Sequence, residues 1–194
     1  MQAAAGTPLN AQQHTSDDGT EATTRPRRGL FWAVLALAAV WVGLDQLVKA
    51  WAEATLTPGE PVPVVGELFQ LRLVYNPGAA FSMATNATAL LTVLATAVSA
   101  YIVWSARRLG SRGWALGLGL LLGGAVGNLV DRLVRAPGPG RGHVVDLFAL
   151  PNFPVFNVAD IGISCAAVVI ALLALRGISP DGTRAGQHRE DDSS

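Results

Sequence analysis

The sequence predicts an all-α integral membrane protein with four transmembrane helices and a small β element in its outer-surface loops. Its composition supports this class, because 51% of the 194 residues are hydrophobic and only 14% are charged, against about 25% charged in a typical soluble domain. Four stretches are also apolar and long enough to cross a bilayer, which takes roughly 18 to 20 residues of helix. They cover residues 29–50, 87–105, 114–130 and 158–175.

The two ends of the chain differ from this apolar centre. Residues 1–28 are rich in Thr, Gln, Ala and Asp, and residues 177–194 are similarly polar. Neither segment holds enough apolar surface to offset the conformational entropy of ordering it. We therefore expect disordered cytoplasmic tails on both sides of one membrane domain that covers residues 29–176.

The first stretch, residues 29–50, follows three arginines and carries Asp45 and Lys49 close to its end. Ala50-Trp51-Ala52 has the small-x-small pattern of a signal-peptide cleavage site. Against cleavage, the apolar run is longer than the roughly 7 to 15 residues of a signal-peptide core, and charges interrupt its end. We therefore expect this stretch to be retained as the first transmembrane helix.

The loop after the first stretch contains the alternation of a β-strand. Between residues 69 and 75, apolar side chains fall on every second position, a period that is typical of a strand with one buried face. Pro77-Gly78 follows, a pair that favours a type II turn in which the glycine takes a positive φ. Residues 151–156 are a candidate for a second short extended piece.

The second and third stretches have different characters. Residues 87–105 carry threonines but no charge, so we interpret this stretch as scaffold. In the third stretch, Gly119, Gly123 and Gly127 recur every four residues. This spacing puts small residues on one helix face, where a neighbouring backbone can approach closely.

The distribution of basic residues predicts that both termini lie in the cytoplasm. Cytoplasmic loops of membrane proteins carry an excess of Lys and Arg. Here arginines precede the first stretch, fill the loop between the second and third, and follow the fourth, whereas the loop of residues 51–86 carries only Arg72. The connector of residues 131–157 holds three more arginines and goes against the rule, so these would need partners on the outside.

Seven polar residues of the helices share one depth. With a rise of 1.5 Å per residue, Asp45 lies about 24 Å along the first helix and Asn128 about 21 Å along the third. The fourth helix enters from the outside, which puts Asp160 about one turn in. The seven, expected near the outer leaflet, are Asp45, Lys49, Asn128, Asp131, Arg132, Asn157 and Asp160.

Several of these residues have a purely structural interpretation. Asp45 and Lys49 are four residues apart and suit an ion pair along one helix, and Asn128 suits a hydrogen bond between helices. Asp160 is different, since it is flanked by apolar residues and has no basic residue within a turn. A carboxylate at such a depth indicates a functional site. Asp146 precedes the same helix, and two carboxyls that meet suggest acid–base chemistry.

Other site classes find little support. The formal net charge is zero, with 14 basic and 14 acidic residues, which argues against a nucleic-acid surface. The single cysteine, Cys165, cannot form an internal disulfide. His14, His143 and His188 lack ligand spacing, and no H-E-x-x-H motif occurs, so a zinc protease is excluded. We expect neither a metal nor an organic cofactor.

Five motifs, in this order along residues 29–176, resemble those of the lipoprotein signal peptidases (signal peptidase II). They are Asp45-Gln46-Leu47-Val48-Lys49, Asn76-Pro77-Gly78-Ala79-Ala80-Phe81-Ser82, residues 123–132 ending in Asn128-Leu129-Val130-Asp131-Arg132, Gly142-His143-Val144-Val145-Asp146, and Phe156-Asn157-Val158-Ala159-Asp160. One departure is Leu147-Phe148, where many members carry Phe directly after the aspartate.

The resemblance implies an aspartic endopeptidase of the bacterial inner membrane. It would act as a monomer among membrane lipids, near the outer leaflet, and cut a prolipoprotein before its diacylglyceryl-modified cysteine. Asp146 and Asp160 would form the catalytic pair, one ionised and one protonated, and the sequence does not say which is the base. The residues that would orient the pair, support the pocket or contact substrate are Asp45, Lys49, Asn76, Gly78, Asn128, Asp131, Arg132 and Asn157.

Other interpretations remain open from the sequence. Membrane carboxylates also serve proton relays, so a small transporter is an alternative, although the charges gather at one face and no internal repeat is present. A lipid-binding protein without activity is another. A rhomboid-like serine protease would need a membrane histidine near Ser164, where His143 is the only candidate. Within the aspartic class, Asp131 is an alternative partner for Asp160, although Arg132 beside it favours permanent ionisation.

Overall fold

A computed structural model describes residues 28–78 and 87–184 of the chain. Within them, four helices are long and apolar enough to cross a membrane, which confirms the four predicted spans. They are α1 (Arg28–Thr55), α2 (Ala87–Ala106), α3 (Arg112–Val134) and α4 (Val158–Leu175). Residues 1–27 and 185–194 of the predicted tails, and residues 79–82 of the Asn76 motif, lie outside the described part.

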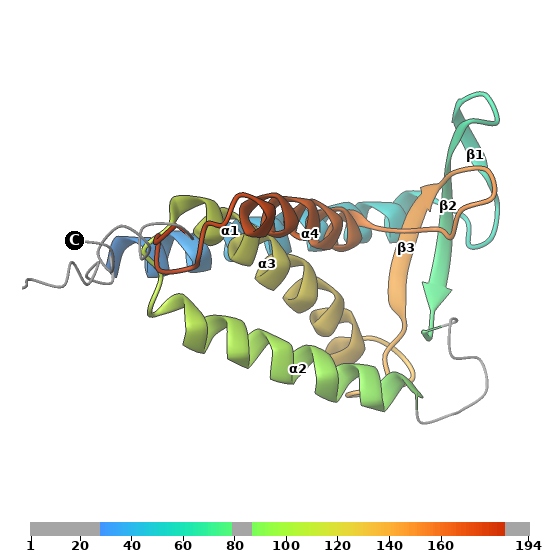
Figure 1. The fold of residues 1–194 in the computed structure, drawn as a ribbon. Helices are drawn as coiled ribbons and strands as arrows, with labels where there is room; N and C mark the ends of the chain where they lie inside the picture. The colour runs from blue at the N-terminus through green and yellow to red at the C-terminus, as the bar shows by residue number, and fades with distance from the viewer. Residues whose placement is uncertain (1–27, 79–86, 185–194) are drawn as a thin grey trace, which may run out of the picture.

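The third helix is the centre of the bundle. α3 packs along both α1 and α4, and along α2 to a smaller extent. Figure 1 shows α2 diverging from α1 and α4 toward the sheet end of the molecule. The sheet stands across that end, and the C-terminal end of α4 lies at the opposite end. The positions that bring functional side chains together are therefore the sheet-proximal ends of α1, α3 and α4.

The predicted glycine face explains how α3 packs so closely. A Cβ atom added at Gly119 would lie 2.8 Å from Leu37 of α1, and one at Gly123 would lie 2.7 Å from Trp41. Gly124, on another face, lies against the backbone carbonyl of Ala159 in α4. Because real Cβ contacts are longer than this, only glycine permits these approaches. Small residues on two faces thus make α3 the central helix.

The small β element is a three-stranded antiparallel sheet in the order β1-β2-β3. The predicted strand is β2 (Phe69–Asn76), and the sheet adds β1 (Val62–Val65) and β3 (Val144–Ala149). Residues 151–156 supply only an isolated bridge, between Phe156 and Phe148. In the register of β2 and β3, Val74 pairs with Asp146 and Asn76 with Val144, so the sheet brings Asn76 next to Asp146.

A small apolar core fixes the sheet to the end of α1. Ala52 of α1 packs with Leu73 of β2 and with Val145 and Leu147 of β3, and all four are at most 1% exposed. Burial of an apolar side chain of this size stabilises the fold by about 1.5 to 3 kcal/mol. The strand that carries Asp146 is therefore held against the helix that carries Asp45 and Lys49.

Residues 177–184, which the sequence assigns to the C-terminal tail, form a closed turn. Ile178 and Arg184 make an isolated bridge, and the Pro180 carbonyl accepts hydrogen bonds from the backbone N–H groups of Gly110 and Ser111. The indole of Trp114 donates to the Ile178 carbonyl at 2.8 Å. This turn therefore docks on the loop between α2 and α3, at the end of the bundle away from the sheet.

Candidate active site

The predicted polar residues meet where the ends of α1, α3 and α4 reach the sheet. α1 supplies Asp45 and Lys49, α3 supplies Asn128, Asp131 and Arg132, and β3 supplies Asp146. Asn76 ends β2, Asn157 is the N-cap of α4 and Asp160 lies in its first turn. These side chains form one hydrogen-bonded set, which confirms the predicted convergence.

Three of the residues form a buried ionic group, called here the Lys49 cluster: Asp45, Lys49 and Asp131. The Lys49 ammonium lies 2.8 Å from Asp45 Oδ2 and 2.6 Å from Asp131 Oδ2, and all three side chains are fully buried. It also donates to Asn128 Oδ1 at 3.1 Å. The ion pair expected from the spacing of Asp45 and Lys49 is therefore present, with a second carboxylate added from α3.

The Lys49 cluster also binds backbone groups beside the candidate catalytic residues. Asp45 Oδ1 accepts from the N–H of Ala159 at 2.9 Å, and Asp131 Oδ2 accepts from the N–H of Val145 at 3.2 Å. Ala159 precedes Asp160 in the chain, and Val145 precedes Asp146. Each aspartate of the cluster therefore positions the residue before one of the two predicted catalytic aspartates.

Asp146 and Asp160, called here the aspartate pair, have neutral partners. Asp146 accepts from Asn157 Nδ2 at 2.6 Å and from Asn76 Nδ2 at 2.9 Å. Asp160 accepts from Asn128 Nδ2 at 2.9 Å and from the N–H of Asn157 at 3.2 Å. In the part of the chain that the structure describes, neither carboxylate forms an ion pair with Lys or Arg.

Asn157 connects the two members of the pair. Its side-chain oxygen accepts from the N–H of Asp160 at 3.0 Å, while Asp160 accepts from its backbone N–H, the reciprocal pattern of a capping box. Its Nδ2 donates to Asp146 and also to Asn128 Oδ1 at 3.1 Å. The start of α4 thus fixes one aspartate through the helix cap and the other through the amide.

The turn after β2 sets the orientation of Asn76. Gly78 has a φ of +101°, the conformation predicted for this glycine, which residues with a Cβ rarely adopt. Its N–H donates to Asn76 Oδ1 at 2.8 Å. With the oxygen occupied in this way, the Asn76 amide presents its Nδ2 hydrogens to Asp146.

Burial dominates the acid–base behaviour of Asp146. The residue is only 2% exposed, and loss of hydration raises the pKa of its carboxyl from 3.8 to about 6. The hydrogen bond from Asn76 acts in the opposite direction, and the charge of Asp160 adds to the increase. Asp146 therefore holds a proton more strongly than an aspartate in water does.

Arg132 has spare hydrogen-bonding capacity at the site. One guanidinium nitrogen, Nη1, donates to the Asn128 carbonyl at 3.0 Å, and the guanidinium charge interacts with Asp131, Asp160 and Asp146. Its Nε is buried without a partner, the only such side-chain atom among residues 28–78 and 87–184. The cation therefore faces the pair while keeping a donor available.

Asp131 forms its ion pairs with cations other than the adjacent Arg132, which the sequence indicated would favour its ionisation. Lys49 and Arg135 neutralise Asp131, and Arg135 Nε lies 2.9 Å from Asp131 Oδ1, whereas Arg132 forms no ion pair with it in the described residues. Adjacent residues of a helix point in different directions, and residues four apart share a face. Of the three arginines in residues 131–157 that were expected to need partners, Arg135 has two, since it also pairs with Glu53.

Sequence reasoning missed three residues that support the Lys49 cluster. Gln46 donates to Asp131 Oδ1 and to the Gly127 carbonyl, each at 3.1 Å, and Arg135 links Asp131 to Glu53. A signal was present, because Glu53 follows Lys49 by four residues and Arg135 follows Asp131 by four, the spacing of one helix face. For metal binding, no group of three His, Cys, Asp or Glu side chains is found within the described ranges.

Comparison with known proteins gives a consistent result. Residues 37–176 match the family model described as signal peptidase (SPase) II. The lipoprotein signal peptidase of Rhodococcus jostii is 49% identical over 182 residues, covering 91% of this chain and 90% of the relative. That of Mycolicibacterium smegmatis is 51% identical over 161 residues, covering 83% and 68%. That of Mycobacterium tuberculosis strain H37Rv is 46% identical over 174 residues, covering 90% and 86%.

Two solved structures share the fold. A bacterial membrane enzyme structure at 1.9 Å resolution superposes with a TM-score of 0.68 at 21% sequence identity, over 79% of this chain and 97% of that one. A second, at 2.3 Å resolution, gives a TM-score of 0.67, also at 21% identity, over 84% and 98%. Likeness at this identity establishes the arrangement of helices and sheet.

Proposed function

Since this chain belongs to the signal peptidase II family, we propose that it cuts diacylglyceryl-modified prolipoproteins by acid–base catalysis between Asp146 and Asp160. One observation carries the proposal: a buried carboxylate, Asp146, and a partly buried one, Asp160, are held by neutral amides, beside a cluster in which the other acids are already neutralised by a cation. Carboxylates without a permanent cation can exchange a proton with each other and with water.

The proposed reaction begins with a water between the two carboxyls. The ionised aspartate takes a proton from this water, whose oxygen attacks the scissile carbonyl, while the protonated aspartate donates to the carbonyl oxygen. The tetrahedral intermediate then collapses, the C–N bond breaks, and a proton from the pair passes to the leaving amine. The peptide bond cut would be the one before the lipid-modified cysteine.

We assign the base role to Asp160 and the acid role to Asp146. Asp160 lies in the first turn of α4 and accepts a backbone N–H there, and a helix N-terminus stabilises negative charge. Asp146 is the more buried residue, and its raised pKa of about 6 keeps the shared proton on it.

The remaining site residues would support this chemistry. We propose that Asn76, Asn128 and Asn157 orient the two carboxyls, with Gly78 setting the turn that aims Asn76. The unpartnered Nε of Arg132 suits a substrate carbonyl oxygen. The members of the Lys49 cluster, Asp45, Lys49 and Asp131, would hold the pocket together.

We further propose that both termini are cytoplasmic and that the site lies near the outer leaflet of the bacterial inner membrane. Arg107, Arg108 and Arg112 lie at the end of the bundle opposite the sheet, as the positive-inside rule requires of a cytoplasmic end. Exposed tryptophans mark both ends of α1, with Trp32 66% and Trp51 48% exposed. They are about 28 Å apart along the helix, close to the roughly 30 Å hydrocarbon core. We expect a monomer, surrounded by membrane lipid.

A cleavage assay tests the proposal. Purified full-length chain in detergent is mixed with a diacylglyceryl-modified prolipoprotein, and the Asp146→Asn and Asp160→Asn variants are compared with wild type. We expect each variant to lose about 10²- to 10⁴-fold in rate, the range for a missing general acid or base. Asp181→Asn, in the turn at the far end of the bundle, removes a carboxylate without effect.

Each other result has a defined meaning. If folded Asp146→Asn cleaved at the wild-type rate while Asp160→Asn did not, Asp131 would replace Asp146 as the partner. If folded wild type cleaved nothing, the peptidase assignment would be wrong, and proton uptake into vesicles that depends on Asp160 would be measured next.

A further inference from the structure

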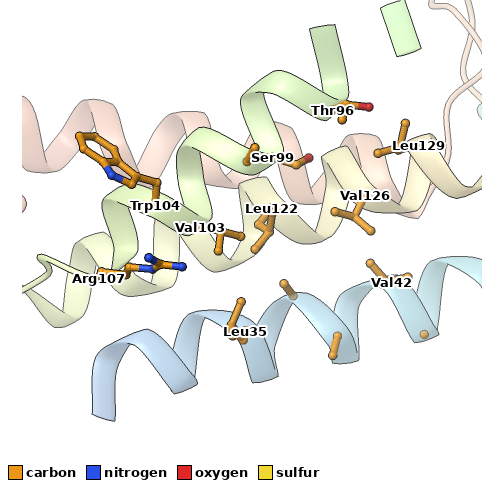
Figure 2. Close-up of a pocket in the computed structure, with 14 residues that line it drawn as sticks. Leu35, Val42, Thr96, Ser99, Val103, Trp104, Arg107, Leu122, Val126 and Leu129 are labelled. Carbon is orange, nitrogen blue, oxygen red and sulfur yellow. The ribbon is translucent and has the colours of Figure 1, made fainter. Parts of the chain in front are cut away.

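A groove of about 850 Å³ runs along the helices outside the candidate active site, between α1 and α2 with α3 as its floor. Figure 2 shows Leu35 and Val42 of α1 across the groove from Ser99 and Val103 of α2. The groove remains open because the facing residues are small: α1 contributes Ala38, Ala39 and Gly43, and α2 contributes Ser99 and Ala100.

The hydroxyl groups that line the groove need no hydrogen bond from a bound molecule. The two hydroxyl groups of the groove are satisfied within α2, since Thr96 Oγ1 donates to the Thr92 carbonyl and Ser99 Oγ to the Ala95 carbonyl, each at 2.8 Å. The rest of the wall is almost entirely aliphatic. Such a surface suits hydrocarbon chains, which bring no polar group that must be satisfied.

One end of the groove carries a positive charge. Arg107, which directly follows α2, lines it there, and Figure 2 shows its guanidinium between α2 and α1. The four ion pairs of the described residues all lie elsewhere. Trp104, which also lines the groove, stacks under the guanidinium of Arg108 at 5.1 Å. Arginine beside tryptophan is typical of the bilayer interface, where lipid headgroups lie.

The length of the groove matches one leaflet. From Thr96 to Arg107, α2 rises about 16 Å, which is close to half of the roughly 30 Å hydrocarbon core. We infer that the groove binds one anionic phospholipid, with its phosphate on Arg107 and an acyl chain along Val103, Leu122 and Val126. Under the proposed topology, this lipid belongs to the cytoplasmic leaflet.

Charge distinguishes this occupant from a signal peptide. The apolar core of a signal peptide would also fit an apolar groove, but it follows a positively charged n-region at the cytoplasmic side. That region would meet Arg107 and be repelled, whereas a lipid phosphate is attracted. Charge complementarity therefore assigns the groove to the anionic lipid.

Native mass spectrometry of the full chain tests the inference, and its outcome does not depend on peptidase activity. The chain is released from micelles that contain phosphatidylglycerol or phosphatidylcholine with identical acyl chains. We expect one phosphatidylglycerol to stay bound, and Arg107→Gln to weaken its retention about five-fold, as expected for one arginine near a lipid surface. Arg176→Gln, which removes a charge from the same end away from the groove, leaves retention unchanged.

A second pair of variants tests the groove itself. Ala39→Leu fills it and is expected to abolish retention, whereas Ala36→Leu, at an exposed alanine outside the lining, is not. Equal retention of the two lipids by wild type would overturn the inference, as would equal losses in Arg107→Gln and Arg176→Gln. A signal peptide that displaced the lipid equally well from wild type and from Arg107→Gln would assign the groove to that peptide instead.

Discussion

The two acidic regions at the sheet end of the bundle are held in different ways. In the Lys49 cluster, one ammonium lies within 2.8 Å of both carboxylates, and no member is exposed. In the aspartate pair, the hydrogen-bond donors found among the described residues are amides or a backbone N–H. A cation fixes a carboxylate in its charged form, whereas neutral donors leave it able to gain and lose a proton.

This difference divides positioning from chemistry. The ion-paired carboxylates of Asp45 and Asp131 bind the N–H groups of Ala159 and Val145, the residues that precede Asp160 and Asp146. Hydrogen bonds to charged groups contribute about 1.5 to 3 kcal/mol each, so these contacts hold the start of α4 and strand β3 firmly. Fixed charges orient the backbone, and the side chains that it carries remain available for proton transfer.

The strongest way to break this comparison is to remove the cation. Lys49→Met leaves Asp45 and Asp131 buried and facing each other, and we expect it to lower the free energy of unfolding by about 3 to 5 kcal/mol. Thermal unfolding of the detergent-solubilised chain, followed by tryptophan fluorescence, measures this loss. Asp160→Asn, in the other region, is expected to change stability by less than about 1 kcal/mol.

A second substitution tests whether the unpaired charge, and not the altered shape of residue 49, causes the loss of stability. In Lys49→Met, Asp131 keeps its ion pair with Arg135 and Asp45 is left without a cation. Adding Asp45→Asn removes this unpaired charge and should restore part of the lost stability. Unfolding of Lys49→Met at the wild-type temperature would show that the cluster does not hold the fold.

The sequence predicted the parts of the molecule that repeat or stay local. Length and hydropathy predicted the four helices, alternation predicted β2, and four-residue spacing predicted the ion pair of Asp45 with Lys49. β3 was not predicted, because six residues of mostly apolar character do not distinguish a strand from other buried structure. Only the pairing with β2 defines it.

The partners of the site residues were harder to predict. Glu53 and Arg135 are 82 residues apart in the chain. The bond from the Val145 N–H to Asp131 uses a backbone group, so no residue type in the sequence indicates it. The expectation that Arg132 favours ionisation of Asp131 relied on adjacency, whereas the ion pairs of Asp131 come from Lys49 of another helix and from Arg135, one turn further along α3. That the described site residues converge was predictable from helix rise, whereas their individual bonds depend on how helices pack.

A smaller effect sharpens the comparison through pH. At low pH the Asp146 carboxyl is neutral in both the folded and unfolded states; as pH rises, the unfolded chain releases its proton near 3.8 and the folded chain only near a pKa of about 6. Stability is therefore lost as pH rises through this window, by about 2 kcal/mol between about pH 4 and about pH 7.

Asp146→Asn isolates this loss. The free energy of unfolding is measured at several pH values for wild type and for the variant. The two plots of this free energy against pH should differ in slope only by the contribution of Asp146. The variant is expected to gain stability relative to wild type as pH rises while remaining inactive, a trade-off typical of functional sites. Parallel curves for the two proteins would mean that Asp146 ionises in the folded chain at its ordinary pKa.

The smallest effect is expected where the Lys49 cluster reaches water, at the ion pair of Arg135 with Glu53. The two side chains are 17% and 28% exposed, against 0% for Lys49 and Asp131. Solvent screens such a pair, so a double-mutant cycle of Glu53→Gln and Arg135→Gln should give a coupling of about 0.5 to 1 kcal/mol. The cycle is needed because Arg135 also bonds Asp131, a contact that the single variant removes as well.

Salt separates the exposed pair from the buried cluster. The coupling between Glu53 and Arg135 should shrink as ionic strength rises, since the Debye length falls from about 10 Å at 0.1 M to about 3 Å at 1 M. The loss caused by Lys49→Met should persist, because ions do not reach buried charges. A coupling above about 3 kcal/mol that resists salt would mean that Glu53 and Arg135 behave as a buried ion pair. The two residues would then belong with the Lys49 cluster as part of the machinery that positions the site.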